Sequence, residues 1–215
     1  EAPLRFAWPY VLETLIDKSE VLNMGIKGTG IDVMYLRWKY DALNYNPDVV
    51  IYAIFMDDVQ RINPCIYKPK FNIIDGKLAI TNLPPPTLQE IARTFKEPLI
   101  ESYLYKHIAY NIRYWKGVDK ARFDYGLKRL DLILNEMKEK SAEDCTYLLV
   151  VLITESNNNL VPKIYKDTAI KIKKMLTGKS IPFVDQVDIF AAYDYNLHEE
   201  DSQKSFDYER GNQHL

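Results

Sequence analysis

The amino-acid sequence predicts an α/β fold built on a parallel β-sheet. Two apolar runs of strand length, Val49–Met56 and Thr146–Ile153, contain almost no polar side chains, which is typical of strands covered on both faces. Segments with helical periodicity lie before, between and after these runs, and such an alternation is the pattern of βαβ units. We therefore expect parallel strands joined by helices.

Length and composition restrict the class of protein. The 215 residues, of which 47% are hydrophobic, suffice for one sizeable core but not for two ordinary domains, so residues 1–215 are predicted to form a single domain. The net charge is -2 and lysines are scattered among acids, which argues against nucleic-acid binding. No run approaches the ~18 apolar residues of a membrane-spanning helix, so no transmembrane segment is expected.

Two cysteines give no sign of a disulfide framework. Cys65 is placed in a loop and Cys145 at the head of a strand, so each is interpreted as a buried or free thiol. No cofactor and no metal are expected. The sequence leaves the compartment and the oligomeric state open.

The central unit of the predicted fold runs from a short apolar segment, Val21–Met24, to the acidic pair Asp57 and Asp58. The segment is interpreted as a strand, and it leads into a loop with three glycines, Gly25, Gly28 and Gly30. Because glycine has no side chain, such a loop can bring backbone N–H groups close to a ligand. A helix with apolar residues at the 3.6-residue period follows from Ile31 to Ala42, before the Val49–Met56 strand.

The acidic pair directly follows the Val49–Met56 strand. Ligands of open α/β sheets bind outside the carboxyl ends of the strands, and both the glycine loop and the pair Asp57 and Asp58 are placed at such ends. We therefore expect them to face one crevice. The pair alone is weak evidence for a Mg²⁺ or Ca²⁺ site, because no third ligand accompanies it.

The first half of the chain adds a helix and a hairpin to this unit. An amphipathic helix over residues 9–16 is expected to pack on the core. Residues 71–80 are expected to form a hairpin around Asp75-Gly76, a strong two-residue turn signal. This hairpin is interpreted as a lid or an edge decoration beside the crevice.

The second half of the chain is predicted as helices with two more strands. Two long helices are expected between residues 87 and 140, and their tyrosines are assigned no chemistry. After the Thr146–Ile153 strand, the polar segment 155–159 is expected to open onto the crevice. A helix over residues 162–178 and a last strand over residues 181–185 complete the pattern.

Two segments of the central unit resemble conserved blocks of a known family, the SGNH (GDSL-type) hydrolases. The letters NMGIKG at residues 23–28 resemble the second block, an N-x-G-x-x-G loop. The letters PDVV at residues 47–50, followed by Asp57 and Asp58, resemble the third block, in which a P-D-V-V strand ends in Asn-Asp. The similarity starts at Trp8-Pro9-Tyr10, covers nearly the whole chain and is to a lipase- or esterase-like branch of that family.

The resemblance implies a three-layer αβα fold with a flavodoxin-like parallel sheet and a β-hairpin insertion near residues 66–82. In the family a serine of a G-D-S motif attacks an ester, a histidine near the C-terminus is the base, and an Asp before it orients the imidazole. The oxyanion is held by the serine N–H, the block-two glycine N–H and the block-three Asn side chain.

Three catalytic candidates follow from the resemblance. They are Gly28 as a backbone donor, Asp57 at the place of the Asn, and His214 as the base, because Gln-His-Leu at the end of the chain resembles the D-x-H-L-N segment of this branch. The substrate implied is a small-molecule or carbohydrate ester.

Three features depart from the family pattern. No G-D-S occurs in the sequence, so we expect a serine-bearing strand before Glu1 and a closing segment after Leu215, the domain then being incomplete at both ends; the alternative is a strand supplied in trans. Asp57 stands in the place of an amide donor, and loss of one donor costs roughly 3 kcal/mol of transition-state stabilisation. Burial and the like charge of Asp58 favour a protonated Asp57 that still donates. Asn212, or Gly211, takes the place of the orienting Asp.

Three functions compete at this level. The leading hypothesis is an SGNH-like esterase, lipase or carbohydrate O-deacetylase with a Ser/His mechanism whose serine lies outside the 215 residues. The second is a catalytically inactive SGNH-like module that binds carbohydrate or a protein partner, in which Asp57 and Asn212 are real losses. The third is a nucleotide-binding domain, suggested by Gly28-Thr29-Gly30, but the spacing departs from G-x-G-x-x-G and the acidic pair repels phosphate.

Overall fold

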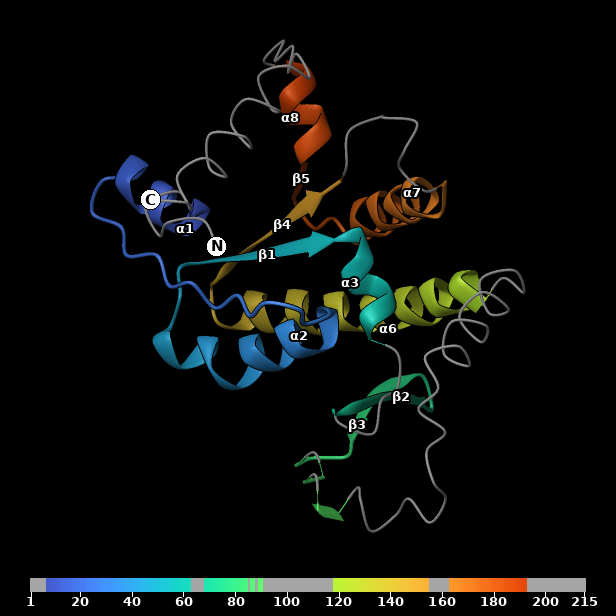
Figure 1. Cartoon of the computed structure of the whole chain (residues 1–215). Coiled ribbons are helices and arrows are strands. Elements are labelled where there is room, and N and C mark those ends of the chain that lie inside the picture. The colour runs from blue at the N-terminus through green and yellow to red at the C-terminus, as the bar shows by residue number, and fades with distance from the viewer. Residues whose placement is uncertain are drawn as a thin grey trace, which may run out of the picture.

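The computed structural model describes residues 7–62, 68–84, 86–87, 89–90, 118–154 and 163–192 (Figure 1). The elements in chain order are α1 (Trp8–Leu15), α2 (Ile31–Tyr40), the short 3₁₀ helix η2 (Ala42–Tyr45), β1 (Val49–Phe55), α3 (Met56–Arg61), β2 (Lys70–Ile74), β3 (Lys77–Thr81), α6 (Val118–Glu143), β4 (Tyr147–Ile153), α7 (Lys163–Gly178), β5 (Phe183–Asp185) and α8 (Gln186–Ala192).

The main sheet has three parallel strands in the order β1-β4-β5. β1 and β4 pair along their whole length, from Val49 beside Tyr147 to Phe55 beside Ile153. The short strand β5 pairs only with the second half of β4. Helices connect these strands and flank the sheet, as the alternating pattern predicts, so the α/β class and the parallel pairing are confirmed.

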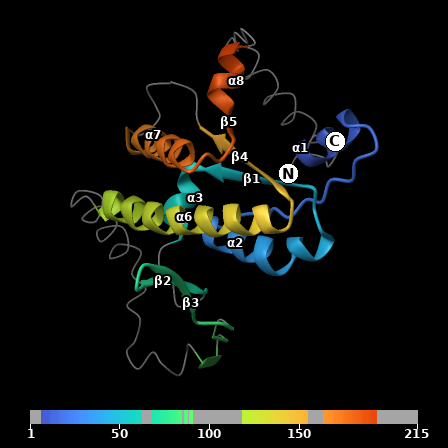
Figure 2. The same cartoon turned by 180° about the vertical axis from the view of Figure 1, so that it is seen from behind.

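The two faces of this sheet are covered to different extents. Tyr52 and Ile54 of β1 point to the buried face, together with the alternate residues of β4, whereas the intervening residues of both strands are half-buried. Figures 1 and 2 show α2 and α6 on one side of the sheet and α8 on the other. The expectation of strands fully covered on both faces is therefore met on one face only.

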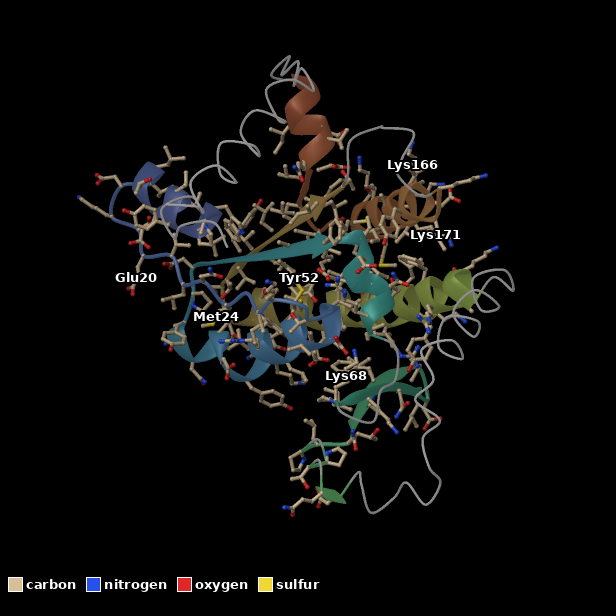
Figure 3. The ribbon with its side chains drawn as sticks, in the orientation of Figure 1. Glu20, Met24, Tyr52, Lys68, Lys166 and Lys171 are labelled. Carbon is tan, nitrogen blue, oxygen red and sulfur yellow. The ribbon has the colours of Figure 1, made fainter. Side chains whose placement is uncertain are left out.

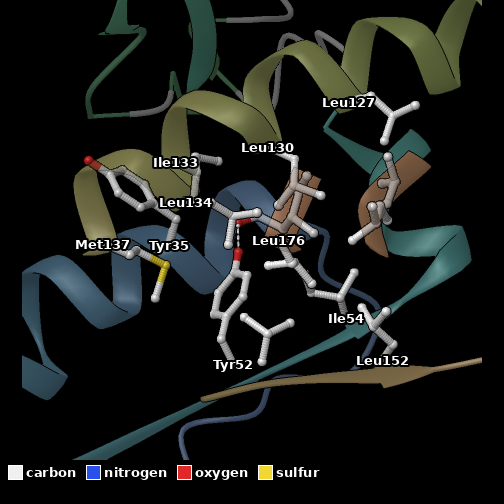
Figure 4. Close-up of a cluster of buried hydrophobic side chains, with 14 of the residues drawn as sticks. Tyr35, Tyr52, Ile54, Leu127, Leu130, Ile133, Leu134, Met137, Leu152 and Leu176 are labelled. Atoms are coloured by element: carbon white, nitrogen blue, oxygen red, sulfur yellow. Dashed lines mark hydrogen bonds between the residues drawn. The ribbon is translucent and has the colours of Figure 1, made fainter. Parts of the chain in front are cut away.

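The core lies between the buried face and α6. Figure 4 shows side chains of α6 lying over Tyr52 and Ile54 of β1, with Tyr35 of α2 beside them. The Tyr52 hydroxyl donates to the Ile31 carbonyl over 2.8 Å, which satisfies its polar atom inside the core. The buried α6 residues recur at helical spacing: Phe123, Leu127, Leu130, Ile133, Leu134 and Met137.

One glycine permits α3 to approach α6. A Cβ atom built at Gly126 would lie 2.0 Å from the carbonyl oxygen of Val59. No side chain fits in that space, so the backbone of α3 rests directly on α6. This contact fixes the helix that carries Asp57 and Asp58.

The segment predicted as the first strand is not a strand. Val21–Met24 is irregular, and side chains bind the backbone at its two ends: Glu13 accepts from the Val21 N–H over 2.9 Å, and Asn23 accepts from the N–H of Gly25, just after the segment, over 3.0 Å. Such local bonds compete with pairing into a sheet. In Figures 1 and 2 the segment between α1 and α2 runs beside β1 and in the same direction. Within the described residues, β4 is the only strand that pairs with β1.

Helix α1 was expected to pack on the core and does not. Pro9 is its one buried residue, whereas Trp8 is 51% exposed and Leu15 is 77% exposed. Apolar periodicity shows that one face of a helix is apolar, but it does not show what covers that face.

The predicted hairpin is confirmed as β2 and β3. Asp75 and Gly76 have φ angles of 50° and 74°, as a two-residue turn with two left-handed positions requires. The base of the hairpin is tied to α6, because Tyr125 and Arg129 both donate to the Phe71 carbonyl.

Several expectations concern residues outside the described ranges. The first of the two long helices between residues 87 and 140 is among them, as are the polar segment 155–159 and Cys65. The second long helix is α6. Cys145 is described and is exposed. None of the described helices has the length and apolar character needed to span a membrane.

Candidate active site

The acidic pair follows β1 and forms the first turn of α3. Asp57 and Asp58 are the second and third residues of that helix, and the helix N-terminus favours negative charge there. β1 therefore ends just before two carboxylates, as predicted, and both belong to the helix that directly follows it. This places both at the carboxyl end of a parallel strand, where ligands of α/β sheets bind.

Donor groups surround the carboxylate of Asp57. Arg61 Nη2 lies 2.6 Å from its Oδ2 atom, and the Tyr165 hydroxyl donates to its Oδ1 atom over 2.9 Å. Gln60 Nε2 donates to Oδ1 as well. All of these partners donate, so Asp57 acts as an acceptor in this structure. The expectation that Asp57 serves as a protonated donor gains no support from its partners.

Asp58 is held by the same arginine. Arg61 Nη1 lies 2.8 Å from Asp58 Oδ1, so one guanidinium spans both carboxylates. Burial raises the pKa of Asp58 above its usual value; the charge of Arg61 opposes that rise and the charge of Asp57 adds to it.

The glycines of the predicted loop have different roles. Gly28 has a φ angle of +77°, a left-handed conformation that favours glycine, and nothing lies within 4 Å of the position where a Cβ atom would be. The space into which a side chain at Gly28 would project is therefore unfilled. Gly25 has no such backbone requirement, and its N–H is bound by Asn23.

Gly30 joins the glycine loop to α3. It precedes the first residue of α2, and a Cβ atom there would lie 2.7 Å from Cβ of Arg61 and 2.9 Å from Asp32 Oδ1. Only glycine fits between these groups. Because Arg61 also binds Asp57, the end of the glycine loop and the strand tip meet at this residue.

The three candidate residues are placed to different degrees. Asp57 binds Arg61, and Gly30, two residues after Gly28, packs against the same arginine. His214 lies outside the described residues, and so does Asn212. The structure therefore brings together the loop and the acidic pair, and it says nothing of the base.

Sequence reasoning missed three partners of the acidic pair: Arg61, Gln60 and Tyr165. Arg61 follows Asp57 by four residues and Asp58 by three, which is the spacing of ion pairs on one helix face, so this partner was visible in the pattern. Tyr165 comes from α7, 108 residues further along the chain, and no local signal links it to Asp57.

A second carboxylate lies at the carboxyl end of β5. Asp185 accepts hydrogen bonds from the Thr154 hydroxyl, which follows β4, and from the Val187 N–H, and it pairs with Lys173 over 2.5 Å. Burial raises its pKa, but the bonds from Lys173, Thr154 and Val187 outweigh burial, so the pKa of Asp185 is lowered. Its acceptor positions are therefore occupied.

The described residues contain no group of three or more His, Cys, Asp or Glu side chains that could hold a metal ion. No protein-family model matches the chain, and no curated protein or solved structure matches it. The arrangement itself must therefore support any functional statement.

Proposed function

We propose that this chain belongs to an SGNH-like hydrolase that cleaves an ester bond, of the esterase, lipase or carbohydrate O-deacetylase type. One observation carries the proposal: Gly30, the last glycine of the loop, and the acidic strand tip meet at Arg61, at the carboxyl end of a parallel sheet. The two meeting segments are those whose sequences resemble two conserved blocks of this family.

The proposed fold is the flavodoxin-like, three-layer form of the family. The described sheet and its flanking helices are compatible with it. In this proposal the nucleophilic serine lies on a strand outside these 215 residues, and that strand pairs with β1 on the side away from β4.

The proposed reaction uses two half-reactions of acyl transfer. His214 accepts the proton of the serine hydroxyl while the serine oxygen attacks the ester carbonyl, and the Gly28 N–H donates to the oxyanion that forms. The C–O bond to the alcohol then breaks, and the alcohol leaves with the proton from His214. Water, deprotonated by His214, attacks the acyl-enzyme in the same way and releases the acid and the serine.

A second function has one observation in its favour. Asp57 stands where this chemistry needs a donor, yet its carboxylate accepts from Arg61 and Tyr165. A module that has lost catalysis and binds carbohydrate or a protein partner tolerates such an acceptor, and carboxylates bind hydroxyl groups well.

Labelling with a fluorophosphonate tests the hydrolase directly, because this probe reacts with an activated serine. We expect the natural full-length protein to be labelled on a serine that precedes Glu1, with the site identified by mass spectrometry. His214→Ala should abolish labelling, whereas His198→Ala should leave it intact. A folded full-length protein that resists the probe argues for the binding module instead.

A further inference from the structure

A buried carboxylate lies at the start of α2, beside the glycine loop. Asp32 is 1% exposed, and its partner comes from another part of the chain: Lys68 Nζ lies 2.7 Å from its Oδ2 atom. Its other oxygen, Oδ1, accepts from the Val33 N–H over 3.0 Å. A buried carboxylate is very unfavourable without a cation or several donors, so Lys68 is required wherever Asp32 is charged.

Lys68 also binds α3. Its ammonium group donates to the carbonyl oxygen of Arg61 as well as to Asp32. Gly30 lies between the same two partners, because a Cβ atom there would touch both Asp32 Oδ1 and Arg61 Cβ. We call these four residues, Gly30, Asp32, Arg61 and Lys68, the loop brace. Figure 3 shows Lys68 between the hairpin and the ends of α2 and α3.

The hairpin holds Lys68 in place. Asn82, which follows β3, donates to the Lys68 carbonyl over 2.7 Å. Two residues of α6 bind the Phe71 carbonyl at the base of β2, and the Phe71 side chain is buried in the core. The ammonium group of Lys68 is thus presented to the glycine loop from an anchored support.

The loop depends on this support at one point. Nothing lies within 4 Å of the point where a Cβ atom of Gly28 would be, so no contact on that side fixes its backbone. Gly30, only two residues further on, is enclosed by Asp32 and Arg61. A displacement of Gly30 therefore moves the Gly28 N–H as well.

We propose that Lys68 is a positioning residue for the Gly28 N–H, and that the hairpin serves as the support of the glycine loop. This inference rests on the proposed function, in which that N–H stabilises the oxyanion. It replaces the interpretation of the hairpin as a lid or an edge decoration with a defined mechanical role. A small displacement of one oxyanion donor is enough to lower turnover, by as much as about 100-fold.

Four variants of the natural full-length protein test the inference. Lys68→Met should shift or broaden the backbone amide signals of Gly28 and Gly30 in ¹⁵N NMR spectra and lower kcat roughly tenfold to 100-fold with little change in KM. Lys68→Arg keeps a cation and several donors, so it should recover most of the loss. Lys77→Met removes a lysine from the turn end of the same hairpin, where Lys77 pairs with Ile74, and should leave signals and kinetics unchanged.

The double variant Asp32→Asn with Lys68→Met separates positioning from simple stability. It removes the unpaired buried charge and so restores folding even if Lys68→Met alone unfolds. The proposal requires that its Gly28 and Gly30 signals stay displaced and its kcat stay low. Signals that return to their wild-type positions would overturn it. If the wild-type protein hydrolyses no ester, the proposed function fails, while the amide signals still decide whether Lys68 positions the loop.

Discussion

Two strands of the main sheet, β1 and β5, each lead to an aspartate that is bound by a cation and a hydroxyl group. The two aspartates differ in how far their side chains are exposed to water. Asp57 after β1 is bound by Arg61 and Tyr165, and its side chain is 21% exposed. Asp185 at the end of β5 is bound by Lys173 and Thr154, and its side chain is 3% exposed.

The comparison teaches that the type of partner does not identify a functional carboxylate. Both groups have a cation and a hydroxyl donor, but the arginine that binds Asp57 is 41% exposed and also packs against Gly30 of the glycine loop. Asp185 is sealed between β4, β5 and α7. We therefore assign a structural role to Asp185 and a role in ligand contact to the region of Asp57.

The largest expected effect is a loss of stability when Asp185, at the end of β5, is replaced. Asp185→Ala removes the acceptor of three donors, namely the Lys173 ammonium group, the Thr154 hydroxyl and the Val187 N–H. At about 1 to 1.5 kcal/mol for each lost bond, the free energy of unfolding should fall by about 3 to 5 kcal/mol. Urea denaturation followed by circular dichroism measures this loss. Asp188→Ala is the control, because Asp188 contacts the same lysine from an exposed position and should cost little. A loss at Asp185 no larger than at Asp188 would contradict the assignment.

The next effect concerns the helix that carries Asp57. Gly126→Ala pushes a methyl group into the Val59 carbonyl, so α3 must move away from α6, at a cost of about 3 kcal/mol in the free energy of unfolding. Gly178→Ala, at the end of α7 where nothing lies within 4 Å, should be nearly neutral. Equal stability of the two variants would show that α3 does not rest on α6 as described.

A third change, at Asp57 after β1, supplies the donor that the proposed chemistry needs. Asp57→Asn supplies an amide N–H at the strand tip, and we expect ester turnover by the natural full-length protein to rise by about 100-fold. The loss of the pair with Arg61 should cost only about 1 kcal/mol of stability. Asp188→Asn at the other end should leave turnover unchanged. No gain at Asp57, alone or together with Asn212→Asp, would favour the binding module.

The smallest effect is a difference in the sign of pH dependence. A raised pKa in the folded state means that Asp58 favours its protonated form there, so its contribution to stability falls as pH rises from its ordinary value of 3.8 through the raised value. The lowered pKa of Asp185 does the opposite: its contribution is present above that ordinary value and is lost as pH falls through the lowered value. Denaturation from pH 3 to 7 of Asp58→Asn and Asp185→Asn should give slopes of opposite sign relative to wild type.

The fold was predictable where the sequence pattern is local. The apolar runs of β1 and β4 and the Asp75-Gly76 turn each carry their signal within a few residues, and each is confirmed. The prediction was wrong for Val21–Met24 and for the packing of α1. Periodicity does not show which side chains accept from the backbone, as Glu13 and Asn23 do around Val21–Met24. Nor does it show whether another part of the chain covers the apolar face of α1.

The candidate site was predictable only in part. Glycines and acids at strand ends indicated where to look, and Gly30 and Asp57 do meet there through Arg61. The partners Tyr165 and Lys68 come from segments far along the chain, so only the tertiary structure reveals them. His214 stays a prediction, because it lies outside the described residues.

Arg61 uses three chemically separate parts of one residue. Its guanidinium binds the acidic pair, its Cβ atom touches Gly30 and its carbonyl accepts from Lys68. Every amino acid has the carbonyl, and all but glycine have the Cβ atom. Substitution of Arg61 therefore changes the charge beside the acidic pair but keeps the groups that contact Gly30 and Lys68. Substitutions at position 61 can therefore change the charge next to Asp57 and Asp58 without changing how the glycine loop packs on α3.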